Sequence, residues 1–167
     1  GPVYVNFDAA IQEMELDEWP TLHEAASFSA PSAPAPNAAD LEKAVQWLDG
    51  AKDVVILAGR MSRSDEAWKA RIALAEAVGA KVLIGNSPAG FPTKHPLFFG
   101  EAAFNVRPDL RDAMKKADVI LALDYVDLGG TLNQIFPPGN ARTTKIINVT
   151  MDQQLHNGWS MDYQALP

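Results

Sequence analysis

The run from Val54 to Pro96 constrains the fold of this chain more than any other feature. It begins with an apolar segment, Val54 to Ala58, which predicts a strand that ends at Gly59 and Arg60. A helical pattern follows, and then a second apolar segment, Lys81 to Ile84. Short continuous apolar segments are typical of strands that are covered on both faces. The alternation with a helix therefore predicts a parallel α/β sheet, whose ligands bind beyond the carboxyl ends of the strands.

The same alternation continues through the rest of the chain. Asn37 and Ser64 are predicted helix N-caps, and Pro108 is suited to the first turn of a third helix. Further strands are predicted at Asp118 to Leu123 and at Lys145 to Val149. Right-handed crossovers turn such a series into a doubly wound, mostly parallel, Rossmann-like sheet with helices on both faces.

The connection between the second predicted strand and the third helix is unusually long. It extends from Gly85 to about Val106 and is rich in Pro, Gly and Phe. Connections of this type usually have about two to six residues. Because long ordered loops at the carboxyl end of a sheet often carry function, this segment is a candidate binding loop.

The first 36 residues differ in composition from the rest. Pro2 to Asn6 alternates in a way that predicts a short strand, while residues 8–36 are first acidic and then rich in Pro, Ala and Ser. The prolines between Phe28 and Pro36 exclude a helix or a central strand. Since one strand cannot form a domain, we expect residues 1–7 to be the terminal strand of a missing upstream domain. Residues 8–36 would then be a linker, and 37–167 a Rossmann-like domain.

The composition excludes several classes of function. The formal net charge is −7 and the 14 basic residues are scattered, whereas nucleic-acid binding draws on clustered Lys and Arg. No apolar run approaches the roughly 18 residues of a membrane span. Cysteine is absent, which excludes disulfides and thiolate chemistry and agrees with a cytoplasmic protein. We therefore expect neither a nucleic acid nor a membrane as partner.

Four segments together resemble a known family. They are DVVILAGR at Asp53–Arg60, GAKVLI at Gly79–Ile84, GFPTKHP at Gly90–Pro96 with Gly100, and ADVILAL at Ala117–Leu123. Their order and spacing are similar to those of the central domain of thiamine-diphosphate-dependent enzymes, and the acetolactate-synthase-like branch is the most similar. The N-terminal segment GPVYVN resembles the last strand of the pyrimidine-binding domain that precedes the central domain in that family.

This resemblance implies that the chain is a non-catalytic fragment of a larger enzyme. In the family, the glutamate that activates the cofactor lies upstream and a Gly-Asp-Gly motif for metal and diphosphate lies downstream, and neither is present here. The parent would use thiamine diphosphate and magnesium as a carboligase or decarboxylase acting on 2-keto acids or similar compounds. It would be a homodimer or homotetramer. The fragment would hold no catalytic residue, metal or cofactor, and it would position the missing pyrimidine- and diphosphate-binding domains.

Some branches of the family bind FAD or ADP in the central domain, which implies contacts at the strand ends. The residues that match these contacts are Gly59, Arg60, Gly90, Phe91, Asp124 and Tyr125. FAD-binding members carry a glycine-rich stretch after the His-Pro pair, where this chain has Gly100 and then no further glycine up to Asn105. A side chain in place of glycine prevents close backbone approach to a flavin or phosphate. This departure argues against tight FAD binding. The family's last sheet strand is expected beyond Pro167.

Simpler interpretations of the same residues stay open. A lone glycine at a strand end, such as Gly59, is more often a turn than a phosphate cradle. His95 is more simply a hydrogen-bonded loop residue than a general acid or base. Asp124 and Asp127 supply too few ligands for a cation site, and solvated loop charges would explain them. The alternative function is a free-standing module that binds FAD, ADP or NAD, and a third is a scaffold domain with protein partners.

Overall fold

The computed structural model describes residues 3–28, 34–85, 89–102, 106–136, 143–151 and 165–166. The chain divides into two compact units, Gly1–Ala35 and Pro36–Pro167. Residues 1–2 of the predicted N-terminal strand and residues 29–33 of the predicted linker lie outside the described part. Among the described residues, no helix is both long and apolar enough to cross a bilayer.

The N-terminal unit is exposed to solvent at every described position from 3 to 28. It contains a short α-helix, α1 (Ala9–Glu13), and a 3-10 helix at Ala25–Phe28. Its large apolar side chains are uncovered, with Trp19 at 90% exposure. Residues 3–7 are not assigned as a strand. Because a strand is recognised by its pairing, their role as the last strand of another domain stays a prediction.

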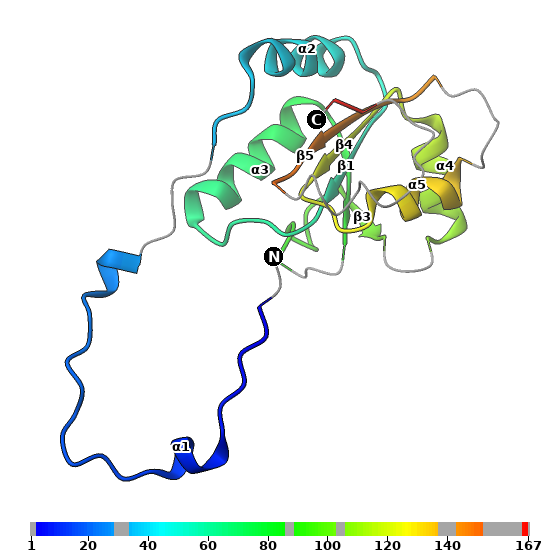
Figure 1. Ribbon diagram of the computed structural model, residues 1–167. Coiled ribbons are helices and arrows are strands. Elements are labelled where there is room, and N and C mark those ends of the chain that lie inside the picture. The colour runs from blue at the N-terminus through cyan, green and yellow to red at the C-terminus, as the bar shows by residue number, and fades with distance from the viewer. Residues whose placement is uncertain are drawn as a thin grey trace. The chain divides into compact units, whose positions relative to one another are not determined.

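The second unit is built on a parallel sheet (Figure 1). Its described strands are β1 (Val54–Ala58), β2 (Lys81–Ile84), β3 (Phe98–Glu101), β4 (Val119–Leu123), β5 (Lys145–Val149) and β6 (Ala165–Leu166). Their order across the sheet is β3-β2-β1-β4-β5-β6. The chain winds outward from β1 in one direction and from β4 in the other, so the topological switch point lies between these two strands.

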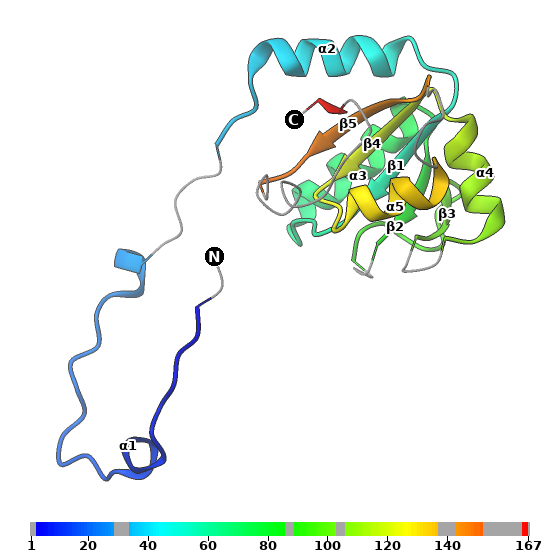
Figure 2. The same ribbon diagram turned by 45° about the vertical axis from the view of Figure 1, so that its right-hand side comes forward.

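Helices cover both faces of this sheet (Figure 2). They are α2 (Ala38–Asp49), α3 (Asp65–Ala77), α4 (Pro108–Lys116) and α5 (Leu128–Ile135). Alternate residues of β1 belong to two separate hydrophobic cores, one on each face of the sheet. Val55 and Leu57 pack with residues of α4 and α5. Val54, Ile56 and Ala58 pack with residues of α2 and α3. All five residues of β1 are buried. The predicted doubly wound α/β fold is confirmed.

The predicted helix starts are formed by the expected local interactions. The Asn37 side chain accepts a hydrogen bond from the backbone N–H of Ala39 at 2.9 Å. Ser64 Oγ accepts one from the N–H of Ala67 at 3.2 Å. Pro108 opens α4 in its first turn. Each cap satisfies backbone donors that a helix leaves free at its N-terminus.

Three elements differ from the sequence prediction. The long connection after β2 contains β3, which pairs with β2 at the edge of the sheet, although residues 86–88 and 103–105 of that connection are not among those described. The residues after β4 form α5 rather than a loop. β6 pairs with β5 through Ile146–Ala165 and Ile147–Leu166, so the sheet gains a strand before Pro167 rather than beyond it.

Candidate functional site at the strand ends

The switch point is closed by a junction of three loops around Asp124. Beyond the strand ends, the N–H of Gly59 donates to Leu123 O and the N–H of Arg60 donates to Asp124 O, both at 2.9 Å. The Arg60 guanidinium donates to Asp124 Oδ1 at 3.0 Å, and the Thr150 hydroxyl donates to the same oxygen at 2.8 Å. The loops after β1, β4 and β5 therefore meet at one carboxylate.

Gly59 is required by this junction because the neighbouring backbone is so close. A β-carbon at position 59 would lie 2.5 Å from the carbonyl carbon of Asp124 and 2.6 Å from Cα of Tyr125. Such separations are far inside van der Waals contact. The space beside this glycine is thus occupied by protein backbone, and a phosphate has no room there. The interpretation of Gly59 as a turn residue explains its presence better than a phosphate cradle does.

Tyr125 is a core residue rather than a residue of the crevice wall. It is 4% exposed, and its hydroxyl donates to Ala102 O at 2.6 Å. Thr131 Oγ1 donates to the same hydroxyl at 3.4 Å. Burial raises the pKa of Tyr125 above its usual value. The side chain therefore joins the loop after β3 to α5 on the side of the sheet that carries α4 and α5.

Phe91 lies on the other side of the sheet from Tyr125. It is 2% exposed and belongs to the core beneath α2 and α3. Gly90 beside it is buried as well. Because Phe91 and Tyr125 belong to opposite cores, the six predicted contact residues do not line one crevice. The structure brings Gly59, Arg60 and Asp124 together with the Tyr125 backbone, and it separates them from the turn at residues 90–91.

His95 makes three contacts near this turn. Its Nδ1 accepts a hydrogen bond from the N–H of Leu97 at 3.2 Å. That bond leaves the proton on Nε2, which lies 3.3 Å from Glu76 Oε1 in α3. The ring also packs edge-to-face against Phe91, with centroids 5.2 Å apart. The geometry agrees with a hydrogen-bonded loop histidine, with a carboxylate partner that sequence spacing did not reveal.

Asp124 and Asp127 both lie in the turn between β4 and α5, and the carboxylate of each accepts hydrogen bonds. Both residues have left-handed backbone, with φ of 44° and 56°, a conformation that costs L-residues about 1–2 kcal/mol. Asp127 Oδ1 accepts from the N–H of Gly130 at 3.0 Å and caps α5. Within the described ranges, no group of three or more His, Asp or Glu side chains could hold a metal ion. The Asp127 carboxylate therefore caps α5 and the Asp124 carboxylate joins neighbouring loops, so neither is simply solvated.

Arg71 is the residue near the strand ends that sequence reasoning missed. It lies in the middle of α3 and is 7% exposed. Its Nη1 donates to Ser62 O at 2.8 Å and its Nη2 to Ala89 O at 3.4 Å, so the guanidinium joins the loop after β1 to the loop after β2. A signal for its burial was present in the sequence. Arg71 lies three residues after Trp68 and four before Ala75, which places it on the same face of a helix as these two apolar residues.

The charge of Arg71 is poorly compensated. Among the described residues, no carboxylate lies within ion-pair distance of it, and its Nε–H is buried without a hydrogen-bond partner. A buried donor left in this way costs about 1–3 kcal/mol. Desolvation by burial lowers the pKa of Arg71 below its usual value. The ring of Trp68 lies 5.2 Å from the guanidinium carbon.

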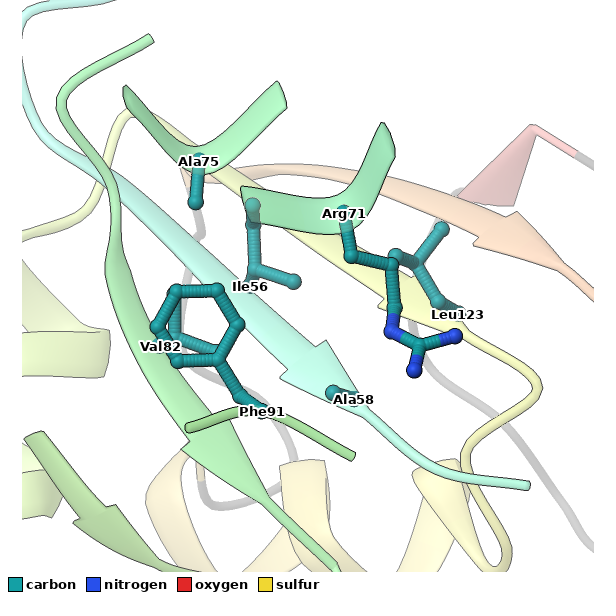
Figure 3. A pocket seen from close by; sticks show the side chains of 7 residues that line it. All are labelled: Ile56, Ala58, Arg71, Ala75, Val82, Phe91 and Leu123. Atoms are coloured by element: carbon teal, nitrogen blue, oxygen red, sulfur yellow. The ribbon is translucent and has the colours of Figure 1, made fainter. Parts of the chain in front are cut away.

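A small cavity lies beside this guanidinium (Figure 3). Apolar side chains from β1, β2, β4 and α3 line it together with Phe91, and Arg71 lies at the end near Ala58 and Leu123. Its volume is about 10 Å³, at the lower limit for one water molecule. A nucleotide does not fit there.

Comparison with known proteins identifies the family. The family described as "Thiamine pyrophosphate enzyme, central domain" matches residues 41–158. A sulfoacetaldehyde acetyltransferase from Rhodobacter capsulatus is 38% identical over 91 residues, which is 54% of this chain and 15% of that protein. Another from Alcaligenes xylosoxydans is 34% identical over 116 residues, which is 68% of this chain and 19% of that protein. The chain thus spans less than a fifth of either relative.

Solved structures agree with this result. A thiamine diphosphate-dependent 4-hydroxybenzoylformate decarboxylase from Rhodococcus jostii aligns with a TM-score of 0.58 at 26% identity, over 86% of this chain and 28% of that one. A chain from Mycobacterium smegmatis, described as a thiamin diphosphate-dependent enzyme, aligns with a TM-score of 0.54 at 23% identity, over 75% and 25%. The second likeness concerns the fold alone. With the family match at residues 41–158, this chain belongs to the central-domain family of thiamine pyrophosphate enzymes.

Proposed function

We propose that this chain is the central, non-catalytic domain of a thiamine-diphosphate-dependent carboligase or decarboxylase of the acetolactate-synthase-like branch. The parent would act on 2-keto acids or similar acyl donors and would use magnesium. The names of the relatives, an acetyltransferase and a decarboxylase, are compatible with this class of chemistry. The lack of cysteine is compatible with our proposal that the parent is cytoplasmic.

The closed junction at Asp124 is the observation that carries the proposal. Among the described residues at the switch point, the N–H groups of Gly59 and Arg60 donate to Leu123 O and Asp124 O, and the Arg60 and Thr150 side chains donate to the Asp124 carboxylate. A junction of this kind makes the domain stiff. Stiffness is what a spacer needs, because small displacements of reacting groups in the flanking domains cost rate.

The N-terminal unit supports a parent with further domains. Six of the 21 acidic residues and none of the 14 basic residues lie in the first 36 positions. Tyr4, Val5 and Phe7 are uncovered, and an unpaired strand gains no burial by itself. We propose that residues 1–7 complete a sheet of an upstream pyrimidine-binding domain, that 8–36 are a linker and that 37–167 are the central domain.

Calorimetry on the 167-residue chain tests the non-catalytic role. We expect no heat of binding when thiamine diphosphate and magnesium are added together. Micromolar binding would contradict the proposal. The complete reading frame is an independent check, because the proposal requires a Gly-Asp-Gly motif downstream of Pro167 and a pyrimidine-binding domain upstream of Gly1. Light scattering on the intact protein would test the proposed homodimer or homotetramer.

The alternative of a free-standing nucleotide-binding module is decided by separate titrations. FAD, ADP and NAD would each be added to the chain while the fluorescence of its tryptophans is followed. We expect no change with any of them, because the space beside Gly59 is filled by the backbone of Asp124 and Tyr125. A saturable signal with one nucleotide would favour the module.

A further inference from the structure

The segment from Asp8 to Phe28 carries six large apolar side chains that stay exposed in the described structure. Their exposed fractions range from 56% at Leu16 to 90% at Trp19. The six are Ile11, Met14, Leu16, Trp19, Leu22 and Phe28. A segment that serves only as a solvated linker is poor in such residues, because low hydrophobicity is what keeps it from collapsing. Large apolar side chains that gather on an exposed segment instead indicate a contact with another protein surface.

The charges of this segment are all negative. It has six acidic residues and no Lys or Arg. The residues from 37 onward are nearly balanced, with 15 acidic and 14 basic, so most of the net charge of −7 belongs to this segment. Acidic and apolar residues alternate from Glu13 to Asp17, and the backbone at Met14 is extended. Because side chains alternate between the two sides of an extended chain, one side is apolar there and the other is acidic.

The length and position of the segment indicate which surface it covers. At about 3.1 Å per residue, residues 8–28 extend over about 65 Å, twice the roughly 30 Å diameter of a small domain. Joining two neighbouring elements usually takes far fewer residues. The segment also continues directly from Val3, Tyr4, Val5 and Phe7, which are exposed by 63–90%. One surface on the upstream side therefore explains the whole run of exposed apolar residues.

We propose that residues 8–28 are a docking arm that packs against the upstream domain of the parent protein. The surface that receives the arm is an apolar groove with Lys and Arg along its rim, because the arm combines apolar side chains with negative charge alone. Trp19, the most exposed side chain of the arm, is its anchor. This inference rests on the proposed function, since the upstream domain belongs to that proposal.

Cleavage by thermolysin tests the arm in the intact parent and in the 167-residue chain. This protease cuts before large apolar residues, and the masses of the products show which cuts lie within residues 8–28. We expect rapid cleavage in the 167-residue chain and slow cleavage in the parent. Equally rapid cleavage in both would show a solvated linker and overturn the proposal. Equally slow cleavage would place the covering surface within the 167 residues and would overturn it as well.

Two variants make the result specific to the anchor. In the parent, Trp19→Ser should speed cleavage of the arm by roughly 10- to 100-fold, because cleavage follows the undocked fraction and one buried large side chain changes that fraction by about this factor. In the 167-residue chain it should leave the rate unchanged. Val45→Ser is the matched control, since Val45 is 56% exposed but lies in α2, outside the arm. It should not change the rate in either protein, and an unchanged rate for Trp19→Ser in the parent would refute the anchor.

Cross-linking identifies the surface that covers the arm. With photoreactive benzoylphenylalanine in place of Leu22, cross-links in the parent should lead to peptides upstream of Gly1 in the same chain. Cross-links to residues 37–167, or between two copies, would contradict the proposal. The reading frame separates this inference from the proposed function. An upstream pyrimidine-binding domain together with a freely cleaved arm would reject the docking alone, whereas a reading frame without that domain would reject both.

Discussion

Replacing Gly59 with alanine should destabilise the second unit strongly. The added methyl group would meet the carbonyl carbon of Asp124 at 2.5 Å and Cα of Tyr125 at 2.6 Å. These are backbone atoms that no rotamer change can move. The loop after β4 must shift away, which breaks the two bonds from the N–H groups of Gly59 and Arg60.

The expected loss in the free energy of unfolding has two contributions. Overpacking of a well-packed site costs about 1–3 kcal/mol. The two lost backbone hydrogen bonds contribute about 1 kcal/mol each. The sum is about 3–5 kcal/mol, a large part of the roughly 5–15 kcal/mol by which domains are usually stable. At an m-value of about 2 kcal/mol/M, the urea midpoint should fall by about 2 M.

Alanine variants at two other glycines distinguish the cost of the steric clash from the cost of a left-handed backbone. Gly79 has a φ of +60°, and a β-carbon there would meet nothing within 4 Å. Gly79→Ala should therefore cost only the strain of a left-handed residue, about 1–2 kcal/mol. Gly50 has a φ of −85° and an added β-carbon would lie 3.4 Å from Gln46 O. Gly50→Ala should change the free energy of unfolding by less than about 0.5 kcal/mol.

Urea unfolding of the three variants, followed by circular dichroism, tests the contact at Gly59. The loss in the free energy of unfolding should be largest for Gly59→Ala, smaller for Gly79→Ala and smallest for Gly50→Ala. If Gly59→Ala unfolds at the same urea concentration as Gly50→Ala, then the loops after β1 and β4 are not in contact and the closed junction is wrong. A phosphate would then have room beside Gly59.

Two further predictions concern pH. Tyr125→Phe should lower the free energy of unfolding by about 1–3 kcal/mol, because Ala102 O and Thr131 Oγ1 lose their buried partner. Burial raises the pKa of Tyr125 in the folded chain above its ordinary value of 10.0, so its stabilisation is complete below that pH and is lost as the pH rises through the folded value. In strongly alkaline solution, denaturant midpoints should therefore fall more steeply for the unmodified chain than for Tyr125→Phe, and parallel slopes would contradict this. Hydrogen bonds from the N–H groups of Asp53 and Lys52 hold the pKa of Asp118 below its usual value. The stabilisation by Asp118 is present above pH 3.8 and is lost as the pH falls through the pKa of the folded chain. Asp118→Asn should therefore make the free energy of unfolding decline less steeply in acid. The same decline in both proteins would argue against these hydrogen bonds.

The elements that could be predicted from the sequence are those with local signals. β1 and β4 are continuous apolar segments, and Asn37, Ser64 and Pro108 mark helix starts by their own chemistry. Two of the elements that the sequence did not predict, β3 and α5, lack such signals. β3 (Phe98–Glu101) is a short edge strand inside a segment rich in Pro and Gly. α5 begins after Asp127 and contains Gly129 and Gly130, which suggest a turn, yet it is stabilised by burial of Leu128, Leu132 and Ile135.

The candidate site was predictable only in part. The position of the strand ends follows from chain order and from the right-handedness of crossovers. The side of the sheet on which Phe91 and Tyr125 pack cannot be predicted in this way. Each residue lies in a loop, where neither the strand period of two nor the helix period of 3.6 applies. The contact between His95 and Glu76 joins residues of different elements and has no local pattern at all.

Local sequence was enough to establish the doubly wound sheet and the resemblance to the central domain of thiamine-diphosphate enzymes, because apolar periodicity and caps act over a few neighbouring residues. The roles of the strand-end residues became clear only from the way the chain packs. Gly59 is needed because the backbone of Asp124 and Tyr125 lies against it. Arg71 has a buried Nε–H without a hydrogen-bond partner, and in the part of the chain that the structure describes no acidic group lies within ion-pair distance of its guanidinium. Both facts depend on distances between segments far apart in the chain, and local chemistry does not specify such distances.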